Sequence, residues 1–413
     1  MSSRNVVYRA PKINKFGVKF TRDYTLEMGE LVPILCEYAM PNSYWSLRGS
    51  HKLRTMPLIA PYMHDTYVFT RYFRVPLRLL MDEALYSNYL MGGKNDDDNT
   101  ETPKVNSGAD GYAAGSLMDY LGYASNYYND KNQEVKVANF TQNAWALRAY
   151  WKVVNDHFVN TNITDEIEFS TAPGLDTTTP KDIFYVRWGL DKYTNAMISL
   201  SRGDPVYLPL GQNAPVVSDG HQLMMVNYSQ SYGTPLTPRN ITNAAIDRPY
   251  LAVNDAGDKG TFTLYSPDGR DPNNTSGYMA DLSKASSIDV NQLRDTMALG
   301  FGKNLSMYIG NKFQDWLYGI FGARVSDARL QRSEYLGGDV TPLYVDDVDQ
   351  TSSTTETSPQ GNLAGKGISI NGRNKIRCYC EEPCVILGLM YILPRTSYFQ
   401  GSRKWMNYNS RYD

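Results

Sequence analysis

The side chains that could carry out acid–base or nucleophilic chemistry are widely spaced in this sequence. Its four histidines stand far from one another: His51, His64, His157 and His221. None belongs to an HExxH motif, and there is no GxSxG element or recognisable nucleophilic cysteine context. A triad can assemble from distant positions, so this scatter alone does not exclude an enzyme. His157 lies on a Trp-containing helical pattern that favours a hydrogen-bonded structural role. We assign no catalytic residue.

Two short segments approach cofactor-binding or metal-binding patterns without matching them. Gly361–Lys366 (GNLAGK) has a spacer one residue shorter than a phosphate-binding P-loop, and Gly367 replaces the Ser or Thr that would hold magnesium. The run Asp96, Asp97 and Asp98 carries the oxygen ligands that hard cations prefer, but EF-hand spacing is absent. A solvated loop is the simpler interpretation. We expect no cofactor and no bound metal.

The cysteines do not form a zinc-binding pattern. They occur at four positions: Cys36, Cys378, Cys380 and Cys384. Cys378 and Cys380 would share one face of a strand, with no His pair or second CxxC nearby. We therefore expect free, buried thiols in a reducing cytoplasm.

Two segments combine positive charge with features that suit nucleic acid. The first 22 residues carry six cations and no carboxylate: Arg4, Arg9, Lys12, Lys15, Lys19 and Arg22. Such an arm can neutralise phosphates whatever the base sequence. Near the other end, Arg403, Lys404 and Trp405 lie among further cations and tyrosines, a mixture that suits stacking on unpaired bases. We predict nucleic-acid contact for both segments, the alternative being a solvated or subunit-contact surface.

Composition indicates a folded protein with extensive contacts. The 413 residues carry a formal net charge of −2 with 42% hydrophobic and 20% charged residues, which excludes a strongly basic coat polymer and a disordered chain. Tyrosine is unusually common, with 32 residues against 13 Phe and 6 Trp. Because tyrosine joins apolar area to a hydroxyl, this excess favours interfaces that are partly wet. No apolar stretch of secretory length is seen near the start, and we expect no signal peptide.

Apolar periodicity predicts strands separated by long polar stretches. A strand is expected over Val32–Tyr38, and a second one begins at Tyr44 after a turn at 41–43. Further strands are expected over Asp65–Val75, Ile183–Leu190 and Val206–Leu210. Within 367–393 we expect paired strands joined by a tight turn at Asn371 and Gly372. The apolar run Val385–Leu393 is too short to span a bilayer and suits a buried strand. Helices are expected over Leu77–Tyr89, over roughly Phe140–Phe158, and from Asp289 to about Phe321 with breaks at Gly300, Gly302, Gly310 and Gly319. Polar loops are expected at about 94–133, 211–288 and 346–367.

Five longer strings together resemble the major capsid proteins of microviruses, which are small single-stranded-DNA phages. The strings are RTMPLIAPYMHDTYVFTRYFRVPLRLLMDE (54–83), YVRWGLDKYTNAMISLSRGDPVYLPLG (185–211), DARLQRSEYLGG (327–338), PQGNLAGKGIS (359–369) and LPRTSYFQG (393–401). The resemblance is closest to the gokushovirus-like branch and runs from about Phe20 to the last residues. Ser333 stands where the family pattern leads us to expect proline. Relatives continue beyond the position of Asp413, so we expect a compact variant or an incomplete chain.

The resemblance implies a mainly β fold and a structural role. The expected architecture is a single eight-stranded antiparallel jelly roll of the viral capsid type, with long loop insertions and a few helices. It implies a basic arm at 1–22 and a capsid domain at 23–413 with insertions at about 94–133, 211–288 and 346–367. Sixty copies would form a T=1 icosahedral shell around circular single-stranded DNA, assembled in the cytoplasm of the host bacterium. The 211–288 insertion would build a three-fold protrusion used in host attachment.

Charge arithmetic adds a partner to this picture. Sixty arms with six cations each supply far less charge than a genome with on the order of thousands of phosphates. We therefore expect a small basic packaging protein, polyamines or metal ions to neutralise the rest, as the family also implies. The further partners expected are copies of the chain and a host surface glycan or receptor, with no membrane. The rival hypotheses are a glycan-binding β-sandwich module and a jelly-roll hydrolase, because such folds serve many functions.

Overall fold

The computed structural model divides the chain into two compact units, which we describe separately. The first comprises Met1–Ala196 and Ile309–Asp413, and the second Met197–Tyr308. The residues described are 14–59, 63–91, 101–191, 194, 199, 202–207, 216–218, 224–225, 264–265, 278–280, 290–310, 312–349, 351–356, 359–361, 363–372, 374–398 and 401–411. Arg4, Arg9, Lys12, the Asp96–Asp98 run and most of 211–288 lie outside them.

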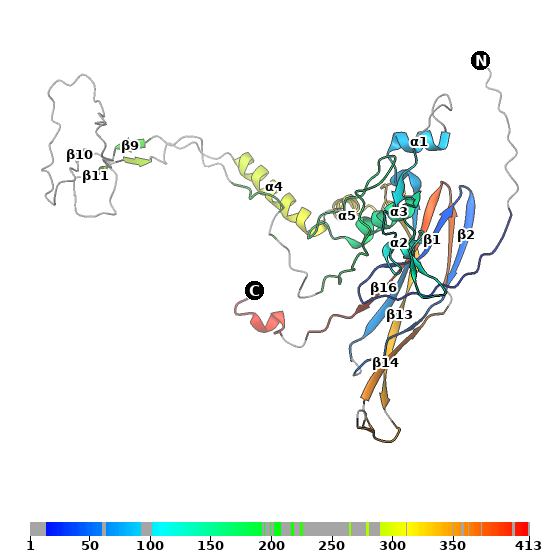
Figure 1. Ribbon diagram of the computed structural model, residues 1–413. Helices are drawn as coiled ribbons and strands as arrows, with labels where there is room; N and C mark the ends of the chain where they lie inside the picture. Colours follow the sequence, from blue (N-terminus) through cyan, green and yellow to red (C-terminus); the bar gives the residue numbers. More distant parts are fainter. Residues whose placement is uncertain are drawn as a thin grey trace, which may run out of the picture. The chain divides into compact units, whose positions relative to one another are not determined.

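The first unit is mainly β, with a curled antiparallel sheet and a few helices (Figure 1). Its strands are β1 (Val32–Ala39), β2 (Ser43–Gly49), β3 (Lys52–Arg54), β4 (Thr66–Pro76), β5 (Lys104–Asn106), β6 (Tyr127–Tyr128), β7 (Glu134–Val135), β8 (Thr141–Asn143), β13 (Glu334–Asp349), β14 (Leu363–Ile370), β15 (Asn374–Cys380) and β16 (Cys384–Pro394). Its helices are α1 (Glu83–Met91), α2 (Leu117–Leu121), α3 (Trp145–Val153) and α5 (Phe313–Phe321), with 3₁₀ turns η1 (Leu77–Leu79) and η4 (Lys404–Asn407) and a π-helical turn η2 (Val154–Phe158).

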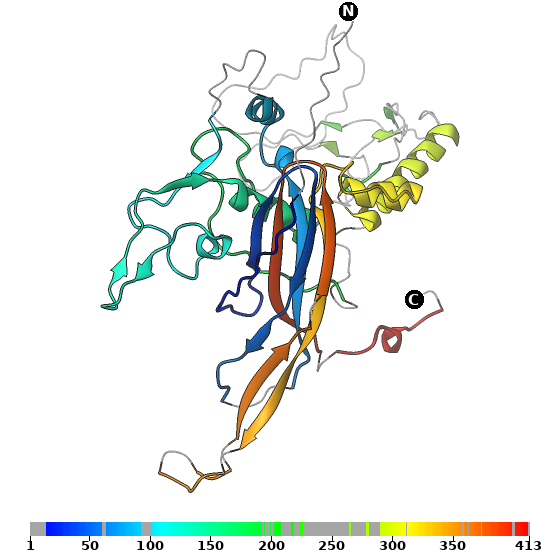
Figure 2. The same ribbon diagram turned by 90° about the vertical axis from the view of Figure 1, so that its right-hand side faces the viewer.

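The main sheet has six strands in the order β1-β16-β4-β13-β14-β3, and each neighbouring pair is antiparallel. β13 pairs with β4 over its first part and with β14 over its last part, where Tyr344 lies opposite Ile368 and Asp349 opposite Leu363. A bulge at Gly337, where φ is 134°, marks a register shift against β4. β13 and β14 therefore continue together as an arm beyond the other strands (Figure 2).

The core lies on both faces of β16, as its uninterrupted apolar sequence predicts. Val385, Leu387 and Leu389 face a large cluster that includes Phe73 of β4 and Tyr150 of α3. The alternate residues of β16 face smaller clusters on the opposite side of the sheet: Cys384 and Ile386 in one, and Met390 and Ile392 in the other. Successive side chains of a strand point to opposite faces of the sheet, so an uninterrupted apolar run is expected only in a strand that is covered on both faces. The strand predictions for β1, β4 and β16 are confirmed.

β2 and β15 form a second, two-stranded layer over one end of the main sheet. They pair with each other in antiparallel register, and Trp45 and Leu47 pack with Cys378 and Ile386. The prediction of a hairpin at Asn371 and Gly372 is wrong, because β14 and β15 belong to different sheets. Asn371 and Gly372 are residue types that suit a tight turn, but the burial of alternate β15 side chains against the main sheet decides the pairing. Cys378, Cys380 and Cys384 are free and buried as predicted, and Cys36 is free and half-buried.

Two predicted helices differ from the structure in extent. The segment after Pro76 forms η1 and then α1, which begins at Glu83, instead of one helix from Leu77. The segment 140–158 begins with strand β8, followed by α3 and the π-helical turn η2. Strand β8 forms because Thr141–Asn143 pair with Lys104–Asn106, a long-range partner that helical spacing does not reveal. The helical spacing is confirmed for Leu147 and Trp151, which are buried on α3, whereas Phe140 at the start of the predicted helix lies outside α3 and is exposed.

Two predicted strands and one predicted loop also differ from the structure. The segment 183–190 contains one isolated bridge, between Tyr185 and Glu30, and no strand. Phe184 lies in the core through hydrogen bonds to Leu31 and to the Tyr150 hydroxyl, so its apolar residues are buried without a ladder. Val206 and Tyr207 are not in a strand either. The loop expected over 346–367 is shorter, because β13 runs to Asp349 and β14 begins at Leu363.

The helical region predicted from Asp289 to Phe321 consists of two helices. α4 spans Val290–Ile309, mostly in the second unit, and α5 follows in the first. Gly310, at a φ of 103°, separates them. The predicted breaks at Gly300, Gly302 and Gly319 are wrong, since these residues continue the helices at a modest propensity cost. In the second unit two short strand pairs are also described: β9 (Val216–Ser218) with β12 (Tyr278–Ala280), and β10 (Met224–Met225) with β11 (Leu264–Tyr265).

Candidate functional site

Helix α5 presents an apolar stripe to solvent. Phe313, Trp316, Ile320 and Phe321 recur at the spacing that places side chains on one face of a helix, and all four are exposed, with Phe321 at 64%. The rings pack on one another: Phe313 stacks on Trp316 at 5.9 Å and Trp316 meets Phe321 edge-on at 5.2 Å between centroids. Gly322 ends the helix in the left-handed conformation. A stripe this aromatic on a monomer surface marks a contact surface.

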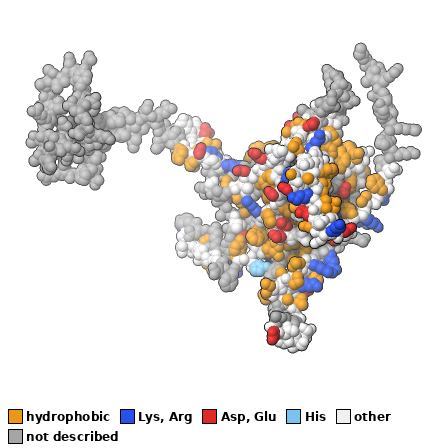
Figure 3. All heavy atoms as spheres, viewed as in Figure 1, with side chains coloured by type: hydrophobic (Ala, Val, Ile, Leu, Met, Phe, Trp, Pro, Cys, Tyr) orange, Lys and Arg blue, Asp and Glu red, His pale blue; other side chains and the backbone are white. Residues whose placement is uncertain are grey.

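The arm formed by β13 and β14 presents a second apolar face. Val340, Tyr344 and Val348 alternate along β13 and are exposed, as is Ile370 on β14. The outer edge of β14 is paired, because the Gly367 carbonyl accepts a backbone hydrogen bond from Thr55 and Gly365 exchanges hydrogen bonds with Leu58. Apolar side chains are likewise spread among charged ones over the face drawn in Figure 3. An exposed apolar surface of this kind is buried from water only when a partner covers it.

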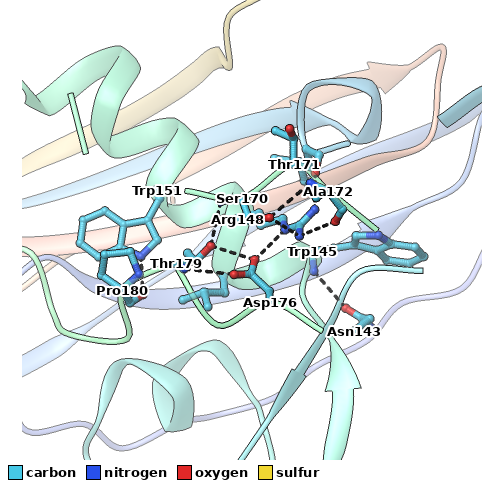
Figure 4. A network of polar contacts seen from close by, with 12 residues as sticks. Asn143, Trp145, Arg148, Trp151, Ser170, Thr171, Ala172, Asp176, Thr179 and Pro180 are labelled. Carbon is cyan, nitrogen blue, oxygen red and sulfur yellow. Dashed lines mark hydrogen bonds and ion pairs between the residues drawn. The ribbon is translucent and has the colours of Figure 1, made fainter. Parts of the chain in front are cut away.

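A buried ion pair holds the long loop that follows η2. Arg148 on α3 and Asp176 are both fully buried, with Nε to Oδ2 at 2.9 Å. Arg148 also donates to the carbonyls of Leu80 and Ala172 and to the Ser170 hydroxyl, and Thr179 donates to Asp176 through its N–H and its hydroxyl (Figure 4). Burial alone would raise the pKa of the Asp176 carboxyl, but the bonds from Thr179 and Arg148 outweigh it and lower that pKa. Each nitrogen of the Arg148 guanidinium and each oxygen of the Asp176 carboxylate has a hydrogen-bond partner, so the pair is structural.

A second polar network centres on η2. Asp156 accepts two hydrogen bonds from Ser333 and an ion pair from Lys152 at 3.0 Å, while Lys312 donates to the carbonyls of Asn155 and Asp156. His157 Nε2 lies 2.9 Å from the Ser333 carbonyl, which confirms the predicted structural role. Burial lowers the pKa of His157 below its ordinary value of 6.5. A neutral, buried imidazole bonded to a carbonyl has no free nitrogen to offer a substrate on that side.

Two hollows at the surface are lined mainly by polar and charged side chains. One of about 480 Å³ is lined by Arg74, Asp327, Glu334 and Glu382 among others. Arg74 bonds Glu334, and Glu382 accepts from Arg78 at 3.0 Å. Within the described part of the chain, no group of three or more His, Cys, Asp or Glu side chains is arranged to hold a metal ion. Nor is any described helix long and apolar enough to cross a membrane.

The structure leaves the predicted DNA-contact residues in two separate segments. Lys15, Lys19 and Arg22 lie on an extended, exposed segment, and Arg22 lies over the Phe20 ring at 5.6 Å. Arg403 is exposed before the turn η4, which begins at Lys404 and exposes 58% of Trp405. Whether either segment touches DNA stays a prediction.

Comparison with known proteins gives these surfaces a context. The model of the family described as "Capsid protein (F protein)" matches residues 9–413. The chain belongs to this capsid protein family. It is 28% identical to "Capsid protein VP1" of Bdellovibrio phage phiMH2K over 98% of this chain and 74% of that protein. It is 26% identical to the proteins of the same name from Chlamydia phage 1 and Spiroplasma virus 4, over 94% of this chain and 72% and 70% of those proteins. The resemblance to microvirus major capsid proteins is thus confirmed.

Membership in a capsid family accounts for the exposed apolar faces. Capsid proteins are structural and assemble with copies of themselves into the shell of a virion, and such assembly buries surface that a single copy leaves exposed. Sequence reasoning missed one set of exposed cations: Arg48 on β2 with Lys375 and Arg377 on β15. Each strand places them at a spacing of two in line with a tyrosine, Tyr44 on β2 and Tyr379 on β15, and this spacing is visible in the sequence. Only the register of β2 against β15 brings them together.

Proposed function

We propose that sixty copies of this chain form a T=1 icosahedral shell that encloses the circular single-stranded DNA of a small bacteriophage. The observation that carries the proposal is the combination of family membership with apolar faces on α5 and on the β13–β14 arm that remain exposed in a single copy. A shell subunit must bury several such faces against neighbours related by different symmetry axes. Assembly takes place in the cytoplasm of the bacterial host.

The strand order supports a jelly roll as the finer architecture. A jelly roll wraps a long antiparallel pair so that its strands, numbered along the chain, lie in the orders 1-8-3-6 and 2-7-4-5 in two sheets. The neighbours β1-β16-β4-β13 fit the first order, and the pair β2 and β15 fits the start of the second. Strands four and five would then come from the stretch between Pro76 and Glu334. We assign 23–413 to this domain, with insertions at about 94–133, 211–288 and 346–367.

The partners follow from the same proposal. The basic arm at 1–22 and the tail around Trp405 contact DNA, and a small basic protein supplies the cations that the shell lacks. The 211–288 insertion forms the three-fold protrusion and contacts a host glycan or receptor.

Sedimentation and negative-stain microscopy of the purified chain test the proposal. The expected result is megadalton particles of uniform diameter, with a subunit number of sixty by native mass measurement. A chain that stays a monomer or a small oligomer in every buffer would contradict it and favour a glycan-binding module. Particles that contain full-length DNA without any basic protein or multivalent cation would contradict the packaging partner alone.

A further inference from the structure

The outward face of the β2–β15 sheet carries three cross-strand pairs in a row. Tyr44 lies opposite Tyr379, Ser46 opposite Arg377, and Arg48 opposite Lys375. Their alternating neighbours, among them Trp45, Leu47 and Cys378, face the other way and pack on the main sheet. Successive pairs on one face of a strand are about 7 Å apart, since the strand rises about 3.4 Å per residue. The outward face is therefore a flat strip with tyrosines at one end and cations at the other.

The positive charge on this strip is not paired with any carboxylate of the part of the chain that the structure describes. Arg48, Lys375 and Arg377 carry this charge, and all three are exposed. Like charges directly opposite one another destabilise a sheet. The pKa of Lys375 is lowered, first by Arg377 and also by Arg48 and by Lys15 of the basic arm. An anionic ligand would relieve this repulsion.

The tyrosines at the other end form an exposed aromatic platform. The rings of Tyr44 and Tyr379 are 4.6 Å apart between centroids and inclined by 32°, and Tyr44 is 82% exposed. The Tyr379 hydroxyl donates to Asn42 Oδ1 at 2.9 Å, and Arg74 donates to the Tyr379 carbonyl. Tyr379 is thus fixed from both sides and supports Tyr44, whose outer ring face is open. Aromatic rings beside a cationic track suit unpaired bases and their phosphates.

We propose that the outward face of the β2–β15 sheet binds single-stranded nucleic acid, with Arg48, Lys375 and Arg377 on phosphates and Tyr44 stacked on a base. This inference rests on the proposed enclosure of single-stranded DNA, and it places the face on the inside of the shell beside the basic arm. Binding of this kind is largely independent of base sequence, because every base offers a ring face for stacking. A purely acidic partner would use the cations and leave Tyr44 without a role.

Binding of fluorescent oligo(dT) by the full chain, measured over a series of salt concentrations, tests the inference. The triple variant Arg48→Ser, Lys375→Ser, Arg377→Ser is compared with a control that loses three exposed cations elsewhere: Lys131→Ser, Arg329→Ser, Lys366→Ser. Each phosphate contact to a single strand contributes about 0.7 to the slope of log affinity against log salt. We expect the slope to fall by about 2 in the triple variant and to stay at the wild-type value in the control.

Two further readouts separate this role from a structural one. Tyr44→Ala should weaken oligo(dT) binding about fivefold or more, whereas Tyr44→Phe should keep it. The triple variant should melt no lower than the wild type, because it removes like-charge repulsion. An unchanged affinity and salt slope in the triple variant would overturn the inference. It would also be overturned if polyglutamate bound as tightly as oligo(dT) and Tyr44→Ala had no effect on the binding of oligo(dT). Wild-type particles that enclose no DNA would instead overturn the proposed function.

Discussion

Ser333 donates both its backbone N–H and its hydroxyl to Asp156 Oδ2, each over 2.8 Å. Ser333 is fully buried and lies just before β13, while Asp156 lies in the π-helical turn after α3. These two bonds join segments that are 177 residues apart in the chain. Proline, which the resemblance led us to expect at this position, has neither an N–H nor a hydroxyl and could make neither bond.

Replacement of Ser333 by proline should therefore destabilise the subunit. Ser333→Ala removes one hydrogen bond to a charged acceptor and should lower the free energy of unfolding by about 1.5–3 kcal/mol. Ser333→Pro removes both bonds, leaves Asp156 with fewer partners, and should cost more than Ser333→Ala. Urea unfolding followed by circular dichroism measures both. Ser397→Ala, at an exposed serine, is the control and should leave the free energy of unfolding unchanged. Equal free energies of unfolding for all three variants would show that the bonds to Asp156 contribute nothing to stability.

Stability should fall in mild acid because of His157. Burial lowers the pKa of His157 in the folded chain below 6.5, the ordinary value that the unfolded chain retains. At pH above about 6.5 both states are neutral there, and below it the unfolded chain binds the proton more readily. The free energy of unfolding should then decrease by up to about 1.4 kcal/mol per pH unit for this residue.

His51 is expected to add a similar contribution, since burial also lowers its pKa. Unfolding measured between pH 7.5 and about 5 should show a shallower acid loss in His157→Gln and in His51→Gln than in the wild type. His64→Gln, at an exposed histidine, is the matched control for the substitution itself. A profile that is flat in the wild type would refute the assignment.

Periodicity in the sequence predicts individual strands better than their partners. β1, β4 and β16 follow from alternation or from an apolar run, and the stripe of α3 follows from helical spacing. The partners of β15 and β8 do not follow, because they depend on which distant surface each strand buries. The dipeptide Asn371-Gly372 suits a hairpin, but the chain there passes from the main sheet to the β2–β15 layer, and packing on the main sheet decides this.

The surfaces that carry function were predicted only in part. The basic arm and the tail are visible as runs of charge, whereas Arg48, Lys375 and Arg377 are isolated cations until β2 and β15 pair. Likewise, Arg148 and Asp176 are 28 residues apart and neither stands in a motif, so their ion pair required the fold. Residues that come together only through the pairing of distant strands cannot be recognised as a group from one sequence.

Breaking the Arg148–Asp176 pair should strongly destabilise the first unit. Arg148→Met leaves the Asp176 carboxylate buried with only Thr179 as a partner, and Asp176→Leu leaves the guanidinium without its counter-charge. Each single change should lower the free energy of unfolding by about 3–5 kcal/mol. The double variant Arg148→Met, Asp176→Leu should be less destabilised than the sum of the two. A double-mutant cycle from urea unfolding measures this coupling, and additive losses would show that the pair does not act as a unit.

Assembly should depend on the apolar stripe of α5. Trp316 lies at its centre between Phe313 and Phe321 and is 40% exposed, so a second copy of the chain can cover it. Trp316→Glu places a charge in that contact. Because a buried aromatic anchor contributes about 2 kcal/mol or more to an interface, this variant should form no particles in sedimentation. The circular dichroism spectrum of the subunit should be retained. Trp316→Phe keeps an aromatic ring and should still assemble, with a raised critical concentration. Particles of normal size from Trp316→Glu would place the copy-to-copy contact elsewhere, with the exposed face of the β13–β14 arm, centred on Tyr344, as the next surface to alter in the same way.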